Sequence, residues 1–231
     1  MSTNSYPNAS IAGAGSIGSG TYNKIDICGS GKANGDIICA DFDASGSAKV
    51  DGNLTCSGTV DVSGAFKVEG NLSCGSLDGS GAVKITGGVV AKEVDVSGAF
   101  HVGGDCEAEE VEIRGAVEIE GLLNAETIDL SLESSGRKSK VGQIGGGSIT
   151  IKPRSGAGGK FLFIFSLGGH AYSRLETTVI EADRVELEYV TADTVRTIDA
   201  KIGDECEIGT LEYSGEIEIS ENAKIGNIVK I

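Results

Sequence analysis

Apolar and polar residues alternate along most of this chain in short steps rather than in long runs. From Leu72 onward the apolar positions advance by 5, 6 and 6 residues again and again, and a second apolar position follows each of them by two. Each step predicts a short strand with inward side chains at i and i+2, followed by a small corner. The first column consists of Leu72, Leu77, Val83, Val89, Val94, Phe100, Cys106, Val111, Val117, Leu123 and Ile128.

Glycine recurs at a spacing that equals three of these steps together. A column of glycines separated by 17 or 18 residues comprises Gly29, Gly46, Gly64, Gly81, Gly98 and Gly115, each followed six residues later by another glycine. The stretch VDVSGAF occurs at 60–66 and again at 94–100, a spacing of 34 residues that paired-helix repeats also show. Its alternation and its β-branched residues favour strand instead. The sequence therefore predicts an all-β fold, a three-sided parallel β-helix with about 17 residues per turn.

The repeat divides the chain into four parts. We expect a flexible Gly/Ser-rich N-terminal tail at 1–20, the N-terminal part of the β-helix at 21–132 and its C-terminal part at 179–231. Between them, 133–178 loses the rhythm and predicts an irregular insertion with loops and an apolar strand. Its apolar run FLFIFSL is either a strand or flap packed on the coil or an exposed partner contact through Phe161, Phe163 and Phe165.

Composition narrows the picture further. With 36 glycines, 5% aromatic residues and no tryptophan, the chain can fill a thin core but not a wide one. Because the net charge is −15, we expect no binding to nucleic acid and no general adhesion to anionic membranes. The N-terminus has no signal-peptide pattern, and no apolar run reaches the roughly 18 residues of a membrane helix, so we expect a cytoplasmic protein.

The six cysteines do not predict a metal site. Cys39, Cys56 and Cys74 recur once per turn in an inward column that alanine fills later, at Ala91 and Ala108, which is typical of small core residues. Structural zinc lacks its usual spacing because no C-x-x-C pair exists and the chain has two histidines. A reducing compartment also disfavours disulfides.

Three further positions were considered for chemistry. Cys28 precedes a corner glycine and should face solvent, either as a reactive thiol or as a tolerated surface residue. His101 takes the outward position that lysine takes in neighbouring turns, and His170 lies in the insertion. Neither has a serine or aspartate in a catalytic arrangement. We therefore expect no catalytic, cofactor or metal site, and we interpret the acidic run at 106–120 as the outer face of strands.

The main enzymatic alternative comes from IGDECEIG at 202–209, which resembles one hexapeptide repeat of β-helical acyltransferases. Those enzymes keep a near-strict six-residue step, whereas this chain follows 5, 6 and 6 over most of its length. A monomeric β-helical binding module that recruits a partner through FLFIFSL is a second alternative. Neither alternative is favoured over a non-enzymatic scaffold that associates with itself.

Several segments together resemble the bactofilin family, the polymer-forming bacterial cytoskeletal proteins. They are SGAFKVEGNL and SGAVKITGGV, GDIICADFDASGSAKVDGNL at 35–54, and the closing stretch at 192–231. The resemblance implies a right-handed coil and end-to-end assembly into filaments without nucleotide, in keeping with the absence of a P-loop signature. It implies a homopolymer in the cytoplasm, with the inner face of the membrane as an alternative location and cell-envelope or membrane-associated proteins as further partners.

The end of the chain fits such assembly. Strand pattern continues through AKIGNIVKI to the last residue, without the polar or helical cap that most solenoids carry. An uncapped turn leaves backbone groups and a slice of core open to another subunit. We therefore expect the polymer interface to include Tyr213, Ile217, Ile219, Ile225, Ile228 and Ile231.

Overall fold

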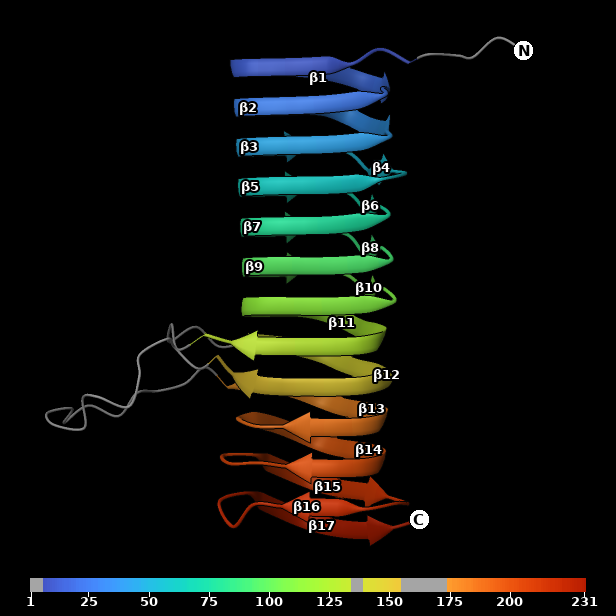
Figure 1. Cartoon of the computed structure of the whole chain (residues 1–231), viewed down its shortest axis with the longest axis vertical. Coiled ribbons are helices and arrows are strands. Elements are labelled where there is room, and N and C mark those ends of the chain that lie inside the picture. The colour runs from blue at the N-terminus through green and yellow to red at the C-terminus, as the bar shows by residue number, and fades with distance from the viewer. Residues whose placement is uncertain (1–5, 134–138, 155–173) are drawn as a thin grey trace, which may run out of the picture.

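The computed structural model describes residues 6–133, 139–154 and 174–231, and the secondary structure of these residues is entirely β. Seventeen strands join in one parallel sheet that coils along a single axis, with the N-terminus at one end and the C-terminus at the other (Figure 1). The strands are β1 (Ala9–Thr21), β2 (Lys24–Cys39), β3 (Asp41–Val50), β4 (Leu54–Cys56), β5 (Thr59–Val68), β6 (Leu72–Ser73), β7 (Ser76–Ile85), β8 (Val89–Val90), β9 (Glu93–Val102), β10 (Cys106–Glu107), β11 (Glu110–Leu132), β12 (Ser139–Pro153), β13 (Leu175–Leu187), β14 (Val190–Ile202), β15 (Glu207–Tyr213), β16 (Ile217–Ile219) and β17 (Lys224–Lys230).

The register of these strands confirms the predicted period. Phe42 pairs with Val60, Val60 with Leu77, and Leu77 with Val94, so that successive turns are 17 or 18 residues apart. About 12 turns stack in this way, and the β-helix predicted from the sequence is the observed fold. Handedness stays an expectation from the family resemblance.

Each regular turn is built from one bent strand and one short strand. In β5 the inward residues are Val60 and Val62 before the bend and Phe66 and Val68 after it. Gly64 makes the bend, with a φ of 123° that residues with a Cβ rarely adopt. A Cβ there would also lie 2.2 Å from the carbonyl oxygen of Gly46 in the turn before. Conformation and close stacking therefore both require the glycine column.

A second corner is held by asparagine and aspartate side chains. The backbone N–H of Asn53 donates to Asp36 Oδ1 at 2.7 Å, that of Asn71 to Asn53 Oδ1 at 2.9 Å, and that of Gly88 to Asn71 Oδ1 at 2.8 Å. Each side chain thus satisfies a backbone donor of the following turn, which the strands alone leave without a partner at a corner.

The core is a narrow column of aliphatic and small residues inside the coil. Phe42 and Phe66 stack one turn apart with ring centroids 5.4 Å from each other. The predicted inward cysteines Cys39, Cys56 and Cys74 are all buried. Packing of small side chains against the next turn, rather than bulky rings, fills the interior.

The structure corrects the expected N-terminal tail. Residues 9–20 form most of β1, a first turn that pairs in register with β2. Ile11 is buried and Ile17 packs partly against the core, while Gly13 makes the bend with a φ of 93°. The small residues between them satisfy the geometry of a turn although they give little hydrophobic pattern.

The expected irregular insertion at 133–178 is also narrower than predicted. β12 forms a turn of its own within it, paired with β11 on one side and β13 on the other, and the coil has resumed by Leu175. Leu132 and Pro153, which end β11 and β12, are register partners. The two strands therefore end at the same corner of neighbouring turns.

The first C-terminal turns are tighter than the interior turns. Ile180 pairs with Val195 and Val195 with Leu211, which makes turns of 15 and 16 residues. Tyr189 and Glu205 have positive φ angles of 57° and 58° at corners where earlier turns use glycine. Since both lie in the left-handed helical region, residues with a Cβ can occupy them.

Candidate functional site: the open ends of the coil

The last turn of the coil has a strand neighbour on one side only. Among the described strands, β16 pairs with β14 and β17 pairs with β15, and neither has a partner on its outer edge. The N–H and C=O groups along these outer edges are therefore available to a further strand. At the opposite end, β1 pairs with β2 alone.

The last turn also exposes the cross-section of the core. Ile219, Ile225 and Ile228 continue the core columns of Ile202, Ile208 and Leu211. One turn inside, those three residues are at most 3% exposed, whereas Ile219 is 37% and Ile228 51% exposed. The same side-chain positions become a surface because no described turn covers them. Ile231, at 66%, extends that surface.

Three of the residues expected at the interface are less open. Tyr213 belongs to the penultimate turn, where the Lys230 ammonium lies 5.5 Å from its ring centroid. Ile217 and Ile225 are half-buried against the core. Val229, which was not among the expected residues, is 42% exposed beside Ile228. The open apolar surface therefore centres on Ile219, Ile228 and Ile231.

Polar groups surround this apolar centre. Arg174 donates to Glu205 at 3.3 Å and to Glu207 at 3.1 Å, and Lys224 approaches Glu207 at 3.3 Å. The two cations lower the pKa of the Glu207 carboxyl, Arg174 more than Lys224. An apolar centre within a charged rim is the usual composition of a protein–protein interface.

The N-terminal end is made of smaller residues. β1 reads ASIAGAGSIGSGT, and its principal inward residue, Ile11, is only 7% exposed. Tyr6, just before the strand, is 49% exposed, and the Tyr22 hydroxyl donates to the carbonyl of Gly18 at 2.9 Å. The two ends therefore share an open strand edge but differ in the aliphatic area they present.

The other sequence candidates are not brought together. His101 lies 3.1 Å from Glu118 on an outward position, in register with Lys84. Phe161, Phe163, Phe165 and His170 lie outside the described residues. In the described ranges, no group of three or more His, Cys, Asp or Glu side chains is arranged to hold a metal ion, and no helix is long and apolar enough to cross a membrane.

Four of the six thiols lack the environment of reactive cysteines. Cys28 is exposed, and its hydrogen bond to the Asp26 carboxylate raises the pKa of the thiol. Burial raises the pKa of Cys74 and Cys106 to about 12 and that of Cys206 to about 11. A raised pKa keeps the thiol protonated and a weak nucleophile.

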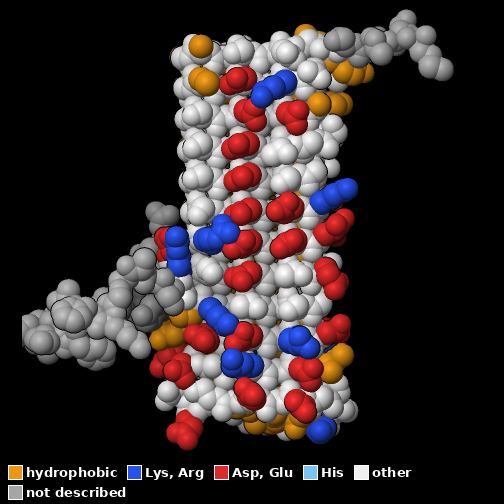
Figure 2. Space-filling view, in the orientation of Figure 1, with side chains coloured by type: hydrophobic (Ala, Val, Ile, Leu, Met, Phe, Trp, Pro, Cys, Tyr) orange, Lys and Arg blue, Asp and Glu red, His pale blue; other side chains and the backbone are white. Residues whose placement is uncertain are grey.

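The acidic residues form a column rather than a cluster. Figure 2 shows carboxylates aligned along one outer face of the coil. In register, this column contains Asp26, Asp43, Asp61, Asp78, Asp95 and Glu112. Arg114 bridges the last two, at 2.7 Å from Asp95 and 2.5 Å from Glu112. The column is the solvated outer face expected from the alternating pattern.

Part of the chain is similar to known proteins. Residues 44–137 match the family model for bactofilin, described as polymer-forming cytoskeletal. The uncharacterized protein YhbF of Bacillus subtilis is 36% identical over 93 residues, which are 40% of this chain and 35% of that protein. The matched part thus spans about a third of the relative's length. No solved structure matches the chain.

Proposed function

We propose that this chain, which carries a bactofilin domain at residues 44–137, is a non-enzymatic scaffold that assembles with itself into filaments, end to end and without nucleotide. The observation that carries the proposal is the uncapped last turn. β16 and β17 have open outer edges, and the core columns end in exposed isoleucines. Both features favour contact with a second copy.

The energetics of such a contact need no chemical step. Covering Ile219, Ile228 and Ile231 removes aliphatic surface from water, and each fully buried side chain of this kind contributes roughly 1.5–3 kcal/mol. Strand pairing across the open edge adds hydrogen bonds in a defined direction. Assembly by burial and pairing therefore proceeds without hydrolysis. The cytoplasm, with the inner face of the membrane as an alternative, and cell-envelope or membrane-associated partners belong to the same proposal.

Negative-stain electron microscopy of the purified protein tests the proposal. We expect filaments for the wild-type chain and their loss in Ile219→Arg and Ile225→Arg, because each places a charge in the last turn, at the exposed Ile219 or at the half-buried Ile225. Val90→Arg is the matched control: Val90 is 54% exposed, as open as Ile228, but it lies on β8 in the middle of the coil.

The control separates end-to-end contact from general stickiness. Filaments should persist in Val90→Arg, since the side of the coil stays outside an end-to-end joint. Uniform monomers of the wild-type protein at high concentration would refute self-assembly. Equal loss of filaments in Val90→Arg and Ile219→Arg would refute the end-to-end arrangement.

A further inference from the structure

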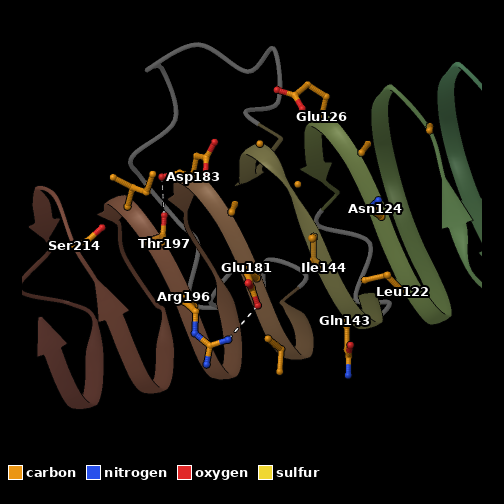
Figure 3. Close-up of a pocket in the computed structure, with 18 of the residues that line it drawn as sticks. Leu122, Asn124, Glu126, Gln143, Ile144, Glu181, Asp183, Arg196, Thr197 and Ser214 are labelled. Atoms are coloured by element: carbon orange, nitrogen blue, oxygen red, sulfur yellow. Dashed lines mark hydrogen bonds and ion pairs between the residues drawn. The ribbon is translucent and has the colours of Figure 1, made fainter. Parts of the chain in front are cut away.

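A groove of about 730 Å³ runs along one corner of the coil, outside the bactofilin-matched residues for much of its length. It lies at the corner that joins the short side of one turn to the bent strand of the next. Its lining comes largely from β11, β12, β13 and β14 (Figure 3). In register, Asn124, Gly145, Glu181 and Arg196 succeed one another along its length. Three turn spacings of about 4.8 Å make this stretch about 14 Å long.

The groove is open because β12 lacks side chains at its centre. Asn124 above and Glu181 below carry outward side chains, whereas Gly145 between them carries none. Glycine weakens a strand, and nothing in the backbone requires it at this position. Gly145 is not among the residues with positive φ, and an added Cβ would come no closer than 3.2 Å to Asn124 Oδ1, the end of a flexible side chain.

Its neighbour shows the contrast. A Cβ on Gly146 would lie 2.2 Å from the carbonyl oxygen of Ala125, so stacking of the turns requires glycine there. Gly145 is free of that constraint. Its missing side chain therefore serves the shape of the groove rather than the fold.

The groove walls carry uncompensated negative charge. Glu126 and Asp183 lie along one rim and make no side-chain hydrogen bond or ion pair with other described residues (Figure 3). The cation of the opposite wall, Arg196, is already engaged, at 3.1 Å from Glu181 and 2.7 Å from Glu212. The groove lining contains three carboxylates, those of Glu126, Glu181 and Asp183, and one arginine, Arg196. The groove as a whole therefore attracts cations.

Part of the remaining lining is aliphatic. Leu122 and Val179 are half-buried along one side of the groove, and Ile198, which is 47% exposed, lies beside Asp183. Aliphatic residues next to free carboxylates suit a ligand that alternates apolar and cationic side chains. An extended peptide does so with a period of two residues, and about four residues at roughly 3.3 Å each cover 14 Å.

We propose that this groove binds an extended basic segment of a partner protein, whose lysine or arginine side chains pair with Glu126 and Asp183 while its apolar side chains pack on Leu122 and Val179. The segment lies across the gap left by Gly145. One end of the groove, at Ser214 and Ile231, adjoins the core surface of the last turn, whereas Gly145 lies several turns away from it. The occupant is a peptide rather than another coil.

Fluorescence anisotropy tests the proposal with the full-length chain and a labelled pentapeptide of alternating lysine and valine. We expect saturable binding that weakens at least about tenfold in Gly145→Val, because the new side chain fills the groove. Ser73→Val is the matched control, since Ser73 occupies the same outward column several turns away. It should bind the peptide as the wild type does.

A second pair of variants separates the groove from the general charge of the protein. Glu126→Gln with Asp183→Asn should weaken binding by about tenfold or more, the effect of losing a charge-assisted hydrogen bond. Asp61→Asn with Asp78→Asn removes the same charge from the acidic column and should change binding less than about twofold. This pair decides the matter even if Gly145→Val fails to fold.

Several results would overturn the proposal. They are no binding of the pentapeptide by the wild type, equal weakening in the two double variants, and equally tight binding of the peptide with glutamate in place of lysine. Displacement of the peptide by a neutral oligosaccharide such as chitotetraose, lost in Gly145→Val, would assign the groove to glycans instead. Filaments should form normally in Gly145→Val, so failure of the groove proposal and failure of self-assembly are read from different measurements.

Discussion

The interior turns and the last turn of the coil follow the same pattern of inward and outward residues, yet they meet different surroundings. Ile202 in β14 and Ile219 in β16 are register partners in one column. The first is 1% exposed and the second 37%, although their sequence contexts both read as strand. What distinguishes the buried from the exposed residue in this column is whether another described turn covers it.

The largest expected effect comes from placing the same substitution on both sides of that boundary. Ile202→Arg buries a charge without a partner and should lower the free energy of unfolding by more than about 4 kcal/mol. Ile219→Arg leaves its guanidinium in solvent and should change it by less than about 1 kcal/mol. Urea denaturation followed by circular dichroism measures both. Since assembly itself stabilises the folded state, the comparison belongs in an Ile225→Arg background.

A similar loss of stability in the two variants would show that the last turn is packed as tightly as the interior. The exposed isoleucines would then be ordinary structural residues. If Ile219→Arg loses filaments but keeps its stability, Ile219 contributes to assembly rather than to folding.

The corner glycines offer a second, smaller test of interior against end. At Gly64 an alanine meets both a φ of 123° and a Cβ position 2.2 Å from the oxygen of Gly46. At Gly13 in the first turn φ is 93°, but no atom lies within 4 Å of the added Cβ. Gly64→Ala should therefore destabilise by roughly 3 kcal/mol or more, and Gly13→Ala by about 1–2 kcal/mol from backbone strain alone.

Urea denaturation again measures the difference, with the two variants matched in chemistry and in their place at the corner. If both lose the same free energy, stacking against the previous turn contributes nothing and backbone conformation alone explains the glycine column. If Gly13→Ala is neutral, the first turn relaxes freely at the open end.

The interior of the coil could be predicted well because its signals are strong and periodic. The glycine column from Gly29 to Gly115 and the paired apolar columns give the turn length directly, and Cys39 and Cys56 were recognisable as core from the alanines that follow. Repetition supplies many independent observations of one geometry. The inward or outward direction of each side chain then follows from its place in the step.

The first turn and the turn in β12 were missed for the opposite reason. β1 is almost entirely glycine, alanine and serine, so Ile11 and Ile17 are its main hydrophobic marks. β12 includes three consecutive glycines, Gly145 to Gly147, which dilute the alternation. These small residues form strands because they pair with the adjacent turns of the coil. Such pairing leaves no periodic pattern of hydrophobic residues in the sequence.

The candidate site could be predicted in outline only. The uncapped C-terminus indicated Ile219, Ile228 and Ile231, but the cover that Lys230 gives Tyr213 depends on how two turns meet. The groove over Gly145 depends on register as well, since Asn124 and Glu181 are far from it in sequence. Contacts between turns are long-range, and their partners emerge only once the stacking is known.

The smallest expected effect concerns the charges on the outer face of the interior turns. Lys49 and Lys67 each lie 2.8 Å from the Glu69 carboxylate, and hydrogen bonds from Lys49 and then Lys67 hold the pKa of Glu69 at about 2, below its ordinary 4.5. Because the folded-state pKa is the lower one, this contribution to stability is present above pH 4.5 and is lost as the pH falls toward 2. The ions are solvent-exposed, so the effect is small.

Thermal unfolding between pH 7 and pH 2 in wild type and in Glu69→Gln measures this contribution. We expect the variant to unfold at a slightly lower temperature at pH 7 and the two curves to converge below pH 4.5, as the wild-type carboxylate takes up its proton. Glu218→Gln is the control from the last turn, where the carboxylate makes no ion pair with other described residues. A constant difference between wild type and Glu69→Gln across the whole range would mean that shape or packing, rather than the charge of Glu69, supports the interior turns at this face.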